Sequence, residues 1–253
     1  MVEVDILFFK RGKSFWIVFN RPKRRNAILP SSYKVLIDAL KSANEDESVM
    51  FTVFMGTGDF YTSGNDFGPK AMEIIANNDN YIGYEGFIDA LIDHRKPIIT
   101  LVNGPAIGIG CTMLTLADYV VASENAYFLC PFTAMGLCPE GTSSKTFEQI
   151  MGYPAAARIA LFAEKMTAEE ALKAGFVSKL LPANGFEAET RKMVDNFEKL
   201  APQSLIITKE LMRGKEWREK MRAVNKIESA TINERMCADE TLERMMAKFG
   251  PKL

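Results

Sequence analysis

One acidic side chain stands apart in this sequence. Glu140, in the stretch GLCPEGTSS at 136–144, is the only charged residue between Ala126 and Ser144. A carboxylate among cysteine, proline, glycine and small hydroxyl residues is either a solvated loop residue or a base in a partly dry pocket, where burial raises its pKa. Such a base can take a proton from one carbon atom and return it to another. The local sequence leaves both interpretations open.

Two glycine-containing loops follow strand-like runs and are candidates for presenting backbone amides to a ligand. They are FYTSGNDFG at 60–68 and NGPAIGIGCTMLTLAD at 103–118. The second loop leads into a short helical pattern, so the amides near Ile109 and Gly110 are expected at a helix N-terminus, where N–H groups lack intrahelical acceptors. It is not a P-loop, because no Gly-Lys-Ser/Thr follows. It is not a dinucleotide fingerprint either, because Met113 replaces the third glycine.

The elements that must position these residues follow an α/β pattern. Strand-like apolar runs alternate with helical patterns, which indicates parallel strands covered on both faces. The runs are 15–19, 49–55, 98–102 and 119–122. Residues 30–46 form a helical pattern that starts with serine caps. Residues 167–175 carry a capping box, Thr167 with Glu170, and a stop at Gly175.

From about Pro202 onward the pattern is helical only. Apolar residues recur every three to four positions, which predicts side chains facing the core, although methionine also suits a subunit interface or a ligand pocket. These residues are Trp217, Met221, Val224, Ile227, Met236, Leu242, Met245 and Phe249. We expect residues 1–200 to form the core and 201–253 a helical region of the same functional domain.

Composition excludes several classes of protein. The chain has 253 residues, a formal net charge of −1 and 25% charged residues, which argues against a basic surface for nucleic acid. No apolar run is long enough to span a membrane, and the start of the chain does not resemble a secretory signal. The four cysteines lack C-x-x-C spacing and His94 is the only histidine, so a zinc site is not expected. We expect free thiols, and His94 at the surface or in a turn.

Several stretches together resemble, in order and spacing, the crotonase (enoyl-CoA hydratase/isomerase) superfamily. They are RPKRRNAI (21–28), FYTSGNDF (60–67), KPIITLVNGPAIGIG (96–110), ADYVVASENAYF (117–128), GLCPEG (136–141) and AEEALKAGFVSKLLP (168–182). The resemblance covers at least residues 15–250. It implies a spiral of repeated ββα units with a helical C-terminal region that covers the pocket and forms homotrimers or dimers of trimers. It also implies action on acyl-CoA thioesters through an enolate held by two backbone N–H groups.

The resemblance assigns the two N–H donors to Asn65 and Ile109. The family often has small residues at both positions, but only the amide is required. Other residues of the two loops and of the basic stretch at 21–25 are expected to contact the substrate, with the CoA nucleotide near the basic stretch. They are Ser63, Gly64, Asp66, Gly108, Gly110, Ala27 and Arg24. For Asp66 a structural role in a turn or a helix cap is the stronger expectation.

The acidic residues separate this chain from the hydratases that it resembles. Where those enzymes have their two glutamates, this chain has Thr112 and Phe132. Glu140 instead matches the position at which monofunctional Δ3,Δ2-enoyl-CoA isomerases, particularly the peroxisomal type, keep their single base. The resemblance therefore favours the base over the solvated loop residue.

The function that the resemblance implies is conversion of 3-cis- or 3-trans-enoyl-CoA into 2-trans-enoyl-CoA in β-oxidation. No metal or redox cofactor is expected, because CoA is part of the substrate. Alternatives are another crotonase reaction, such as acyl-CoA hydrolysis or dienoyl-CoA isomerisation, and a non-catalytic acyl-CoA-binding or RNA-binding relative. The terminal Pro251-Lys252-Leu253 is similar to the Ser-Lys-Leu signal read by the peroxisomal import receptor, so we expect the peroxisome, with the mitochondrion second.

Overall fold

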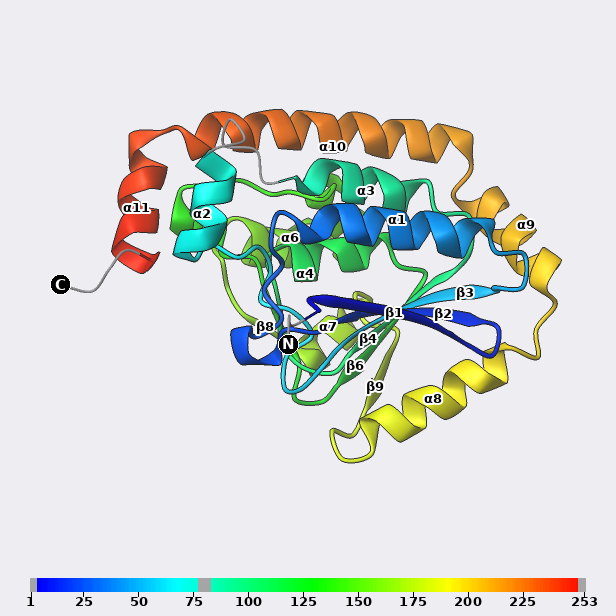
Figure 1. The fold of residues 1–253 in the computed structure, drawn as a ribbon. Coiled ribbons are helices and arrows are strands. Elements are labelled where there is room, and N and C mark those ends of the chain that lie inside the picture. Colours follow the sequence, from blue (N-terminus) through cyan, green and yellow to red (C-terminus); the bar gives the residue numbers. More distant parts are fainter. Residues whose placement is uncertain (1–3, 77–82, 250–253) are drawn as a thin grey trace.

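A six-stranded sheet runs through the centre of the protein. The computed structural model describes residues 4–76 and 83–249. The sheet has the order β1-β2-β3-β4-β6-β9, and every neighbouring pair is parallel except β1 with β2 (Figure 1). Its strands are β1 (Ile6–Arg11), β2 (Ser14–Phe19), β3 (Phe51–Gly56), β4 (Ile98–Val102), β6 (Tyr119–Ser123) and β9 (Lys179–Leu181). The four predicted strands and their parallel pairing are confirmed.

A second, smaller sheet contains β5 (Ala106–Ile107), β7 (Tyr127–Leu129) and β8 (Met166–Thr167). Two isolated parallel bridges extend its row of strands: Thr62 pairs with Ala106, and Ile28 pairs with Asn65. Strands β4 to β7 alternate between the two sheets, as expected for a spiral of ββα units. The spiral therefore brings the loop at 60–68 beside the loop at 103–110.

Helices cover both faces of the large sheet. On one face, α1 (Ser32–Glu45) and α3 (Tyr84–Ile92) pack in the main hydrophobic core, while α8 (Phe186–Phe197) covers the other (Figure 1). Strand β2 shows the division, because Ile17 joins the main core and Val18 joins the cluster under α8. Alternate side chains of a strand point to opposite faces, so a strand covered on both sides reads as a continuous apolar run.

Shorter helical segments connect the strands and carry the loops of interest. They are η1 (Pro22–Arg24), α2 (Pro69–Ala76), α4 (Ile109–Thr112), η2 (Met113–Leu116), η3 (Thr133–Met135), α5 (Ser143–Met151), α6 (Tyr153–Ala160) and α7 (Ala168–Lys173). The predicted capping box is confirmed: Thr167 Oγ1 accepts from Glu170 N, and Glu170 Oε2 accepts from Thr167 N. The serine caps of α1 are wrong in detail, because the side chain of its N-cap residue, Ser31, makes no capping hydrogen bond.

Three helices form the C-terminal region: α9 (Pro202–Met212), α10 (Lys215–Met236) and α11 (Asp239–Phe249). Helix α10 runs along α3, and α11 turns away from the end of α10 and contacts η3 (Figure 1). The predicted core-facing pattern is wrong at Ile227, which is 68% exposed, and at Leu242 and Phe249, which are also exposed. The buried stripe of α10 mixes polar and apolar residues at helical spacing. Its polar members are Asn225, Glu228 and Ser229, and its apolar members are Met221, Ile232 and Met236.

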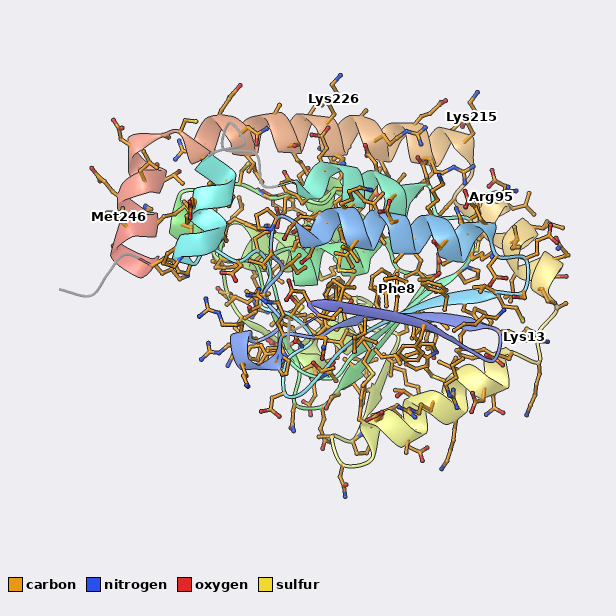
Figure 2. The ribbon with its side chains drawn as sticks, viewed as in Figure 1. Phe8, Lys13, Arg95, Lys215, Lys226 and Met246 are labelled. Carbon is orange, nitrogen blue, oxygen red and sulfur yellow. The ribbon has the colours of Figure 1, made fainter. Side chains whose placement is uncertain are left out.

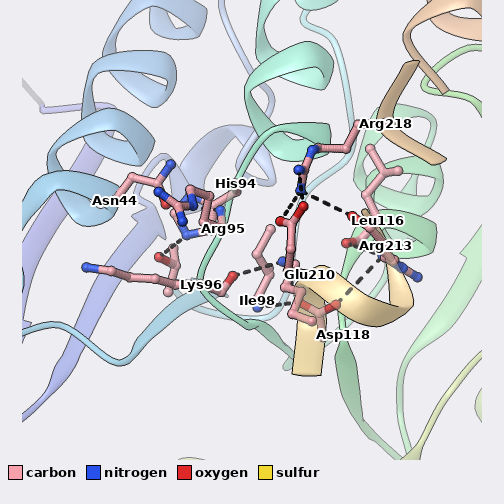
Figure 3. A network of polar contacts seen from close by, with 12 residues as sticks. Asn44, His94, Arg95, Lys96, Ile98, Leu116, Asp118, Glu210, Arg213 and Arg218 are labelled. Atoms are coloured by element: carbon pink, nitrogen blue, oxygen red, sulfur yellow. Dashed lines mark hydrogen bonds and ion pairs between the residues drawn. The ribbon is translucent and has the colours of Figure 1, made fainter. Parts of the chain in front are cut away.

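A polar network joins α9 to the starts of β4 and β6. Asp118 accepts hydrogen bonds from Ile98 N at 2.8 Å and from Lys209 Nζ at 2.7 Å, and Arg213 donates to the carbonyl of Leu116 (Figure 3). This edge lies at the amino ends of the parallel strands, opposite the loops at 60–68 and 103–110. The network therefore fixes the C-terminal helices to the core without facing those loops.

His94 lies in the turn between α3 and β4, but the expected surface position is wrong, because it is 1% exposed. Its Nε2 shares a 2.8 Å hydrogen bond with Thr52 Oγ1. Lys96, two residues further on, donates to the carbonyls of Ala43 and Asp46 and draws the turn under α1. Burial, together with the charges of Lys209 and Lys96, holds the pKa of His94 well below its usual range.

The surface of the described chain has both charged and apolar side chains. Lys215 and Lys226 project from α10, whereas Phe8 of β1 and Met246 of α11 are exposed apolar residues (Figure 2). None of the described helices has the length and apolar character needed to cross a bilayer. The tripeptide Pro251-Lys252-Leu253 lies outside the described residues, and its reading as an import signal stays a prediction.

The buried histidine predicts a specific acid sensitivity. In the unfolded chain His94 takes up a proton near pH 6.5, whereas the folded protein resists protonation, so its contribution to stability is full above that pH and is lost as the pH falls. We expect the free energy of unfolding of the parent to exceed that of His94→Gln at pH 7, and this excess to shrink by about 1 kcal/mol or more when the pH is lowered to 5. Urea unfolding at both pH values measures it; an unchanged difference contradicts a neutral, buried His94.

Candidate active site

A cavity of about 520 Å³ lies where the two glycine-containing loops meet the segment before α5 and the C-terminal helices. Its lining includes a basic group at 23–25 together with Lys248, Ser63 with residues 65–69, residues 107–109, and an apolar group. The apolar group consists of Phe67, Pro131, Phe132, Met135, Leu137, Ile232 and Phe249. Glu140 also lines the cavity, so the residue singled out by sequence does face a pocket.

Close contact between the two loops depends on glycine. A Cβ atom on Gly64 would lie 2.6 Å from the carbonyl oxygen of Ile107, and one on Gly110 would lie 2.4 Å from Thr62 Cγ2. Both distances are well below van der Waals contact. Gly64 and Gly110 were predicted to contact substrate, but they are not among the residues that line the cavity. They allow the two loops to approach each other.

The backbone N–H groups of Asn65 and Ile109 lie where the two loops turn, and neither is used in the backbone pairing of its own segment. In its bridge, Ile28 donates to Gly64 O and accepts from Asp66 N, so the amide of Asn65 points away from that strand. Ile109 is the first residue of α4, and its N–H has no acceptor within the helix. Gly108, with φ of 57°, turns the chain into α4. Asn65, Gly108 and Ile109 all line the cavity.

Glu140 is buried with one carboxylate oxygen free. It is 2% exposed, and its Oε1 has no hydrogen-bond partner among the described residues. Burial raises the pKa of Glu140 to about 8, with the negative charge of Glu228 as a second cause. At neutral pH such a carboxyl group exists in both protonation states, which suits a group that must both accept and donate a proton.

The side chain of Asn65 links Glu140 to a buried tyrosine. A hydrogen bond from Asn65 acts on Glu140 and opposes the rise in its pKa, because it stabilises the ionised form. The hydroxyl of Tyr33 in turn donates to Asn65 Oδ1, which leaves the amide NH₂ to face the carboxylate. Asn65 therefore brings two groups to the site, its backbone N–H and its side-chain amide. The sequence predicted only the first.

Sequence reasoning missed a second buried carboxylate. Glu228 of α10 is 5% exposed and accepts hydrogen bonds from the amides of Thr142 at 2.6 Å and Ser144 at 2.8 Å. Burial raises its pKa to about 7, while these hydrogen bonds lower it. The signal that could have found it is a charged residue in helical phase with Met221 and Ile232, which predicts an acid on the buried face.

Of the other predicted contact residues, Asp66 forms part of a turn, and Arg24, Ala27 and Ser63 line the cavity. Asp66 has the expected structural role: it accepts from Arg21 Nη1 at 2.9 Å and from Gly68 N at 2.8 Å. Arg24, whose Nη2 lies 3.7 Å from Asp66, lines the cavity, as do Ala27 and Ser63. The carboxylates in the described lining are thus Glu140 and Asp66, and only Asp66 forms an ion pair there.

The positions of the two hydratase glutamates carry no carboxylate here. Thr112 is fully buried in α4 and its Oγ1 contacts the carbonyl of Ile109, while Phe132 lines the cavity. Within residues 4–76 and 83–249, no cluster of three or more histidine, cysteine or acidic side chains is placed to hold a metal ion. The arrangement can therefore transfer a proton through one acid beside two backbone donors.

Known proteins share this sequence and architecture. Residues 14–250 match the enoyl-CoA hydratase/isomerase family. Enoyl-CoA delta isomerase 2 of Rattus norvegicus is 41% identical over 247 residues, covering 96% of this chain and 62% of the rat protein, so the chain spans less than two thirds of that relative. Enoyl-CoA delta isomerase 3, peroxisomal, of Mus musculus is 39% identical over 242 residues, covering 93% of this chain and 75% of the mouse protein.

The fold is also found in solved structures. The crystal structure of an enoyl-CoA hydratase/isomerase from Pseudoalteromonas atlantica aligns with a TM-score of 0.89 and 32% identity, covering 97% of both chains. The two sheets, the facing loops and the C-terminal helices are therefore those of the crotonase fold. The chain belongs to the enoyl-CoA hydratase/isomerase family.

Proposed function

We propose that this protein is a Δ3,Δ2-enoyl-CoA isomerase, which moves a double bond of a fatty acyl-CoA from the 3,4 to the 2,3 position. The observation that carries the proposal is the buried carboxylate of Glu140, which has no cationic partner among the described residues, in a cavity that Asn65 and Ile109 also line. The isomerase names of the rat and mouse relatives support it. Both 3-cis and 3-trans substrates, with a 2-trans product, fit the same chemistry.

The reaction needs one base and one oxyanion site. Glu140 removes a proton from C2, and the electron pair of that C–H bond passes into the conjugated system, leaving negative charge on the thioester oxygen. The amides of Asn65 and Ile109 donate hydrogen bonds to that oxygen, and each such donor typically contributes about 3–4 kcal/mol. Glu140 then returns the proton to C4, which leaves the double bond between C2 and C3. Apolar lining excludes water from the intermediate.

The CoA portion of the substrate is assigned to the basic end of the cavity. Lys23, Arg24 and Arg25 line it from one side and Lys248 of α11 from another. Guanidinium and ammonium groups suit phosphate oxygens, and Ala27 leaves space beside them for the nucleotide. The reaction as proposed uses no metal or redox cofactor, because CoA is part of the substrate.

Other activities require groups that differ from those in the cavity. Hydration by two carboxylates lacks its acids at Thr112 and Phe132, and dienoyl-CoA isomerisation usually needs further acidic groups. Acyl-CoA hydrolysis or non-catalytic acyl-CoA binding would leave the 3-enoyl substrate unisomerised, which an assay distinguishes. RNA binding is disfavoured by the mixed charges of α10 and the net charge of −1.

Assembly and location form part of the same proposal. We expect a homotrimer or a dimer of trimers, and the neighbouring exposed apolar side chains of Leu211 and Met212 at the end of α9 support a subunit contact there. We place the activity in the peroxisome, with the mitochondrion second. The name of the mouse relative supports this location.

Replacing the base tests the activity directly. Glu140→Gln keeps the shape of the side chain but cannot take the C2 proton, so we expect conversion of 3-hexenoyl-CoA to 2-hexenoyl-CoA to fall by about 10³-fold or more. The matched control is Glu148→Gln, an exposed residue of α5, which should retain the parent rate. If Glu140→Gln converts the substrate at the parent rate, Glu140 is not the base. If the parent itself is inactive, a non-catalytic acyl-CoA-binding protein is favoured.

Glu140→Gln should also change the stability of the protein in a way that depends on pH. The folded-state pKa of Glu140 is raised to about 8, so the parent loses stability as the pH rises from the ordinary glutamate pKa of about 4.3 to about 8. Glu140→Gln should therefore be more stable than the parent at pH 9 by about 1–3 kcal/mol, and this advantage should shrink toward pH 5. Denaturant unfolding at the two pH values measures the difference.

The pH profile tests the role of Asn65. In the parent, kcat/KM should rise with pH with an apparent pKa near 8, because the base acts in its ionised form. Asn65→Ala keeps the backbone N–H but removes the hydrogen bond that lowers the pKa of Glu140, so the rise should move to higher pH by about one unit. A profile that stays in place indicates that Asn65 acts through its backbone alone.

The assignment of the CoA end is tested with a truncated substrate. Arg24→Gln should raise KM for a 3-enoyl-CoA by about three- to tenfold, since a surface phosphate contact contributes on the order of 1 kcal/mol. The corresponding pantetheine thioester, which lacks the nucleotide, should show no such increase. Equal increases for both substrates place Arg24 elsewhere than beside the nucleotide.

A further inference from the structure

The residues after the base form a turn of unusual backbone geometry. Gly141 and Thr142 have φ values of +66° and +69°, so two consecutive residues adopt the left-handed conformation. Glycine does so freely, but for threonine, whose side chain is branched at Cβ, it is strained. The turn is also tightly enclosed, since a Cβ atom on Gly141 would lie 2.8 Å from Thr112 Oγ1 and 3.3 Å from Ile88 Cδ1. A strained turn persists only when its surroundings hold it.

Glu228 supplies that hold from a distant part of the chain. Its Oε2 accepts from Thr142 N at 2.6 Å and its Oε1 from Ser144 N at 2.8 Å, so both oxygens bind backbone on either side of the first residue of α5. A carboxylate at the start of a helix also interacts favourably with the helix dipole. Glu140 stands two residues before Thr142, and its carbonyl accepts from Ser143 N and Oγ. The position of the base therefore depends on α10.

The charge of Glu228 acts on the same base. The negative charge of Glu228 disfavours ionisation of Glu140 and so adds to the rise in its pKa. The groups that face this pair are Cys138 from the same loop and Tyr84 from α3, both of which are influenced by both carboxylates. Arg235 of α10 donates to the carbonyl of Gly136 in the same loop, and its charge acts on Cys138. It forms its ion pair with Glu240 rather than with either acid.

We propose that Glu228 is a positioning residue for the isomerase reaction, which holds the Gly141–Thr142 turn and places a second negative charge behind Glu140. This proposal rests on the proposed function. Glu228 has no place in the lining of the cavity, so it acts through Glu140 and does not touch substrate. Helix α10 thereby sets both the position and the basicity of Glu140.

Glu228→Gln tests the effect of the Glu228 charge on Glu140 while keeping a side chain that can still bind the turn. Glutamine keeps one oxygen acceptor for the turn but removes the charge, so Glu140 should ionise at a pH about one unit lower. The rise in kcat with pH should move down accordingly, opposite to the shift expected for Asn65→Ala. A weaker base also removes the C2 proton more slowly, so kcat above the rise should fall about tenfold with KM changed less than twofold.

Two further variants complete the test. Glu228→Asp keeps the charge but shortens the reach to Thr142 and Ser144, so kcat should fall while the pH of the rise stays in place. The control is Glu85→Gln, which alters a hydrogen bond from Ser229 to α3 one residue away from Glu228 and should leave both kcat and the pH profile unchanged. If Glu228→Gln folds poorly, the same substitution is made in Thr142→Gly, in which the turn is no longer strained.

A measurement independent of activity decides the outcome. In protein labelled with ¹³C at the glutamate carboxyl carbon, the signal of Glu140 is identified by its loss in Glu140→Gln and titrated in the parent and in Glu228→Gln. A lower titration midpoint in Glu228→Gln supports the proposal. An unchanged midpoint, or a drop in kcat with no shift of the pH profile, overturns it and leaves Glu228 as a helix cap. A parent without isomerase activity rejects the proposed function, while the titration still tests the influence of Glu228 on Glu140.

Discussion

A buried carboxylate without a cationic partner is the feature on which the rest of this site depends. Transfer of an ionised carboxylate out of water is strongly unfavourable, and a protein usually pairs it or neutralises it. Here Asp66 is paired with Arg21, whereas Glu140 is not paired with any cation in the described part of the chain. Its burial therefore appears as a raised pKa. The remainder of the fold must supply the stability that this residue withdraws.

The spiral fold also places two loops that are distant in the sequence side by side. Asn65 and Ile109, the proposed oxyanion donors, are 44 positions apart in the sequence. Their loops are joined by the Thr62–Ala106 bridge and by the two close contacts that glycine allows. Backbone amides fixed in this way need no reorganisation when charge develops on a bound carbonyl oxygen. The proposed role uses only the backbone N–H, so it is compatible with asparagine and isoleucine at these positions.

Those parts of the molecule that depend on local pattern were predictable from the sequence. The strands β2, β3, β4 and β6 read as apolar runs, and the capping box of α7 is written in four consecutive residues. Contacts between distant segments were not predictable in this way. His94 is buried because Lys96 draws its turn under α1, and nothing near residue 94 indicates that. For the site, pattern and family resemblance indicated Glu140 and the two loops, but not Glu228 or the side-chain role of Asn65.

The same contacts bear on where this protein can be divided. The helical pattern that begins at about Pro202 suggests a boundary near residue 200. Yet Ile232 of α10 and Phe249 of α11 line the cavity, and Phe249 packs against Phe67 from the first glycine-containing loop. Glu228 reaches the turn behind the base, and Asn225 and Ser229 bind α3 on the same face. A chain cut at the apparent boundary would lose a wall of the pocket and the acceptor for two amides of a strained turn. The polar residues within the buried stripe of α10 thus make the helical region part of the catalytic unit, although by secondary structure alone it looks like a separate appendage.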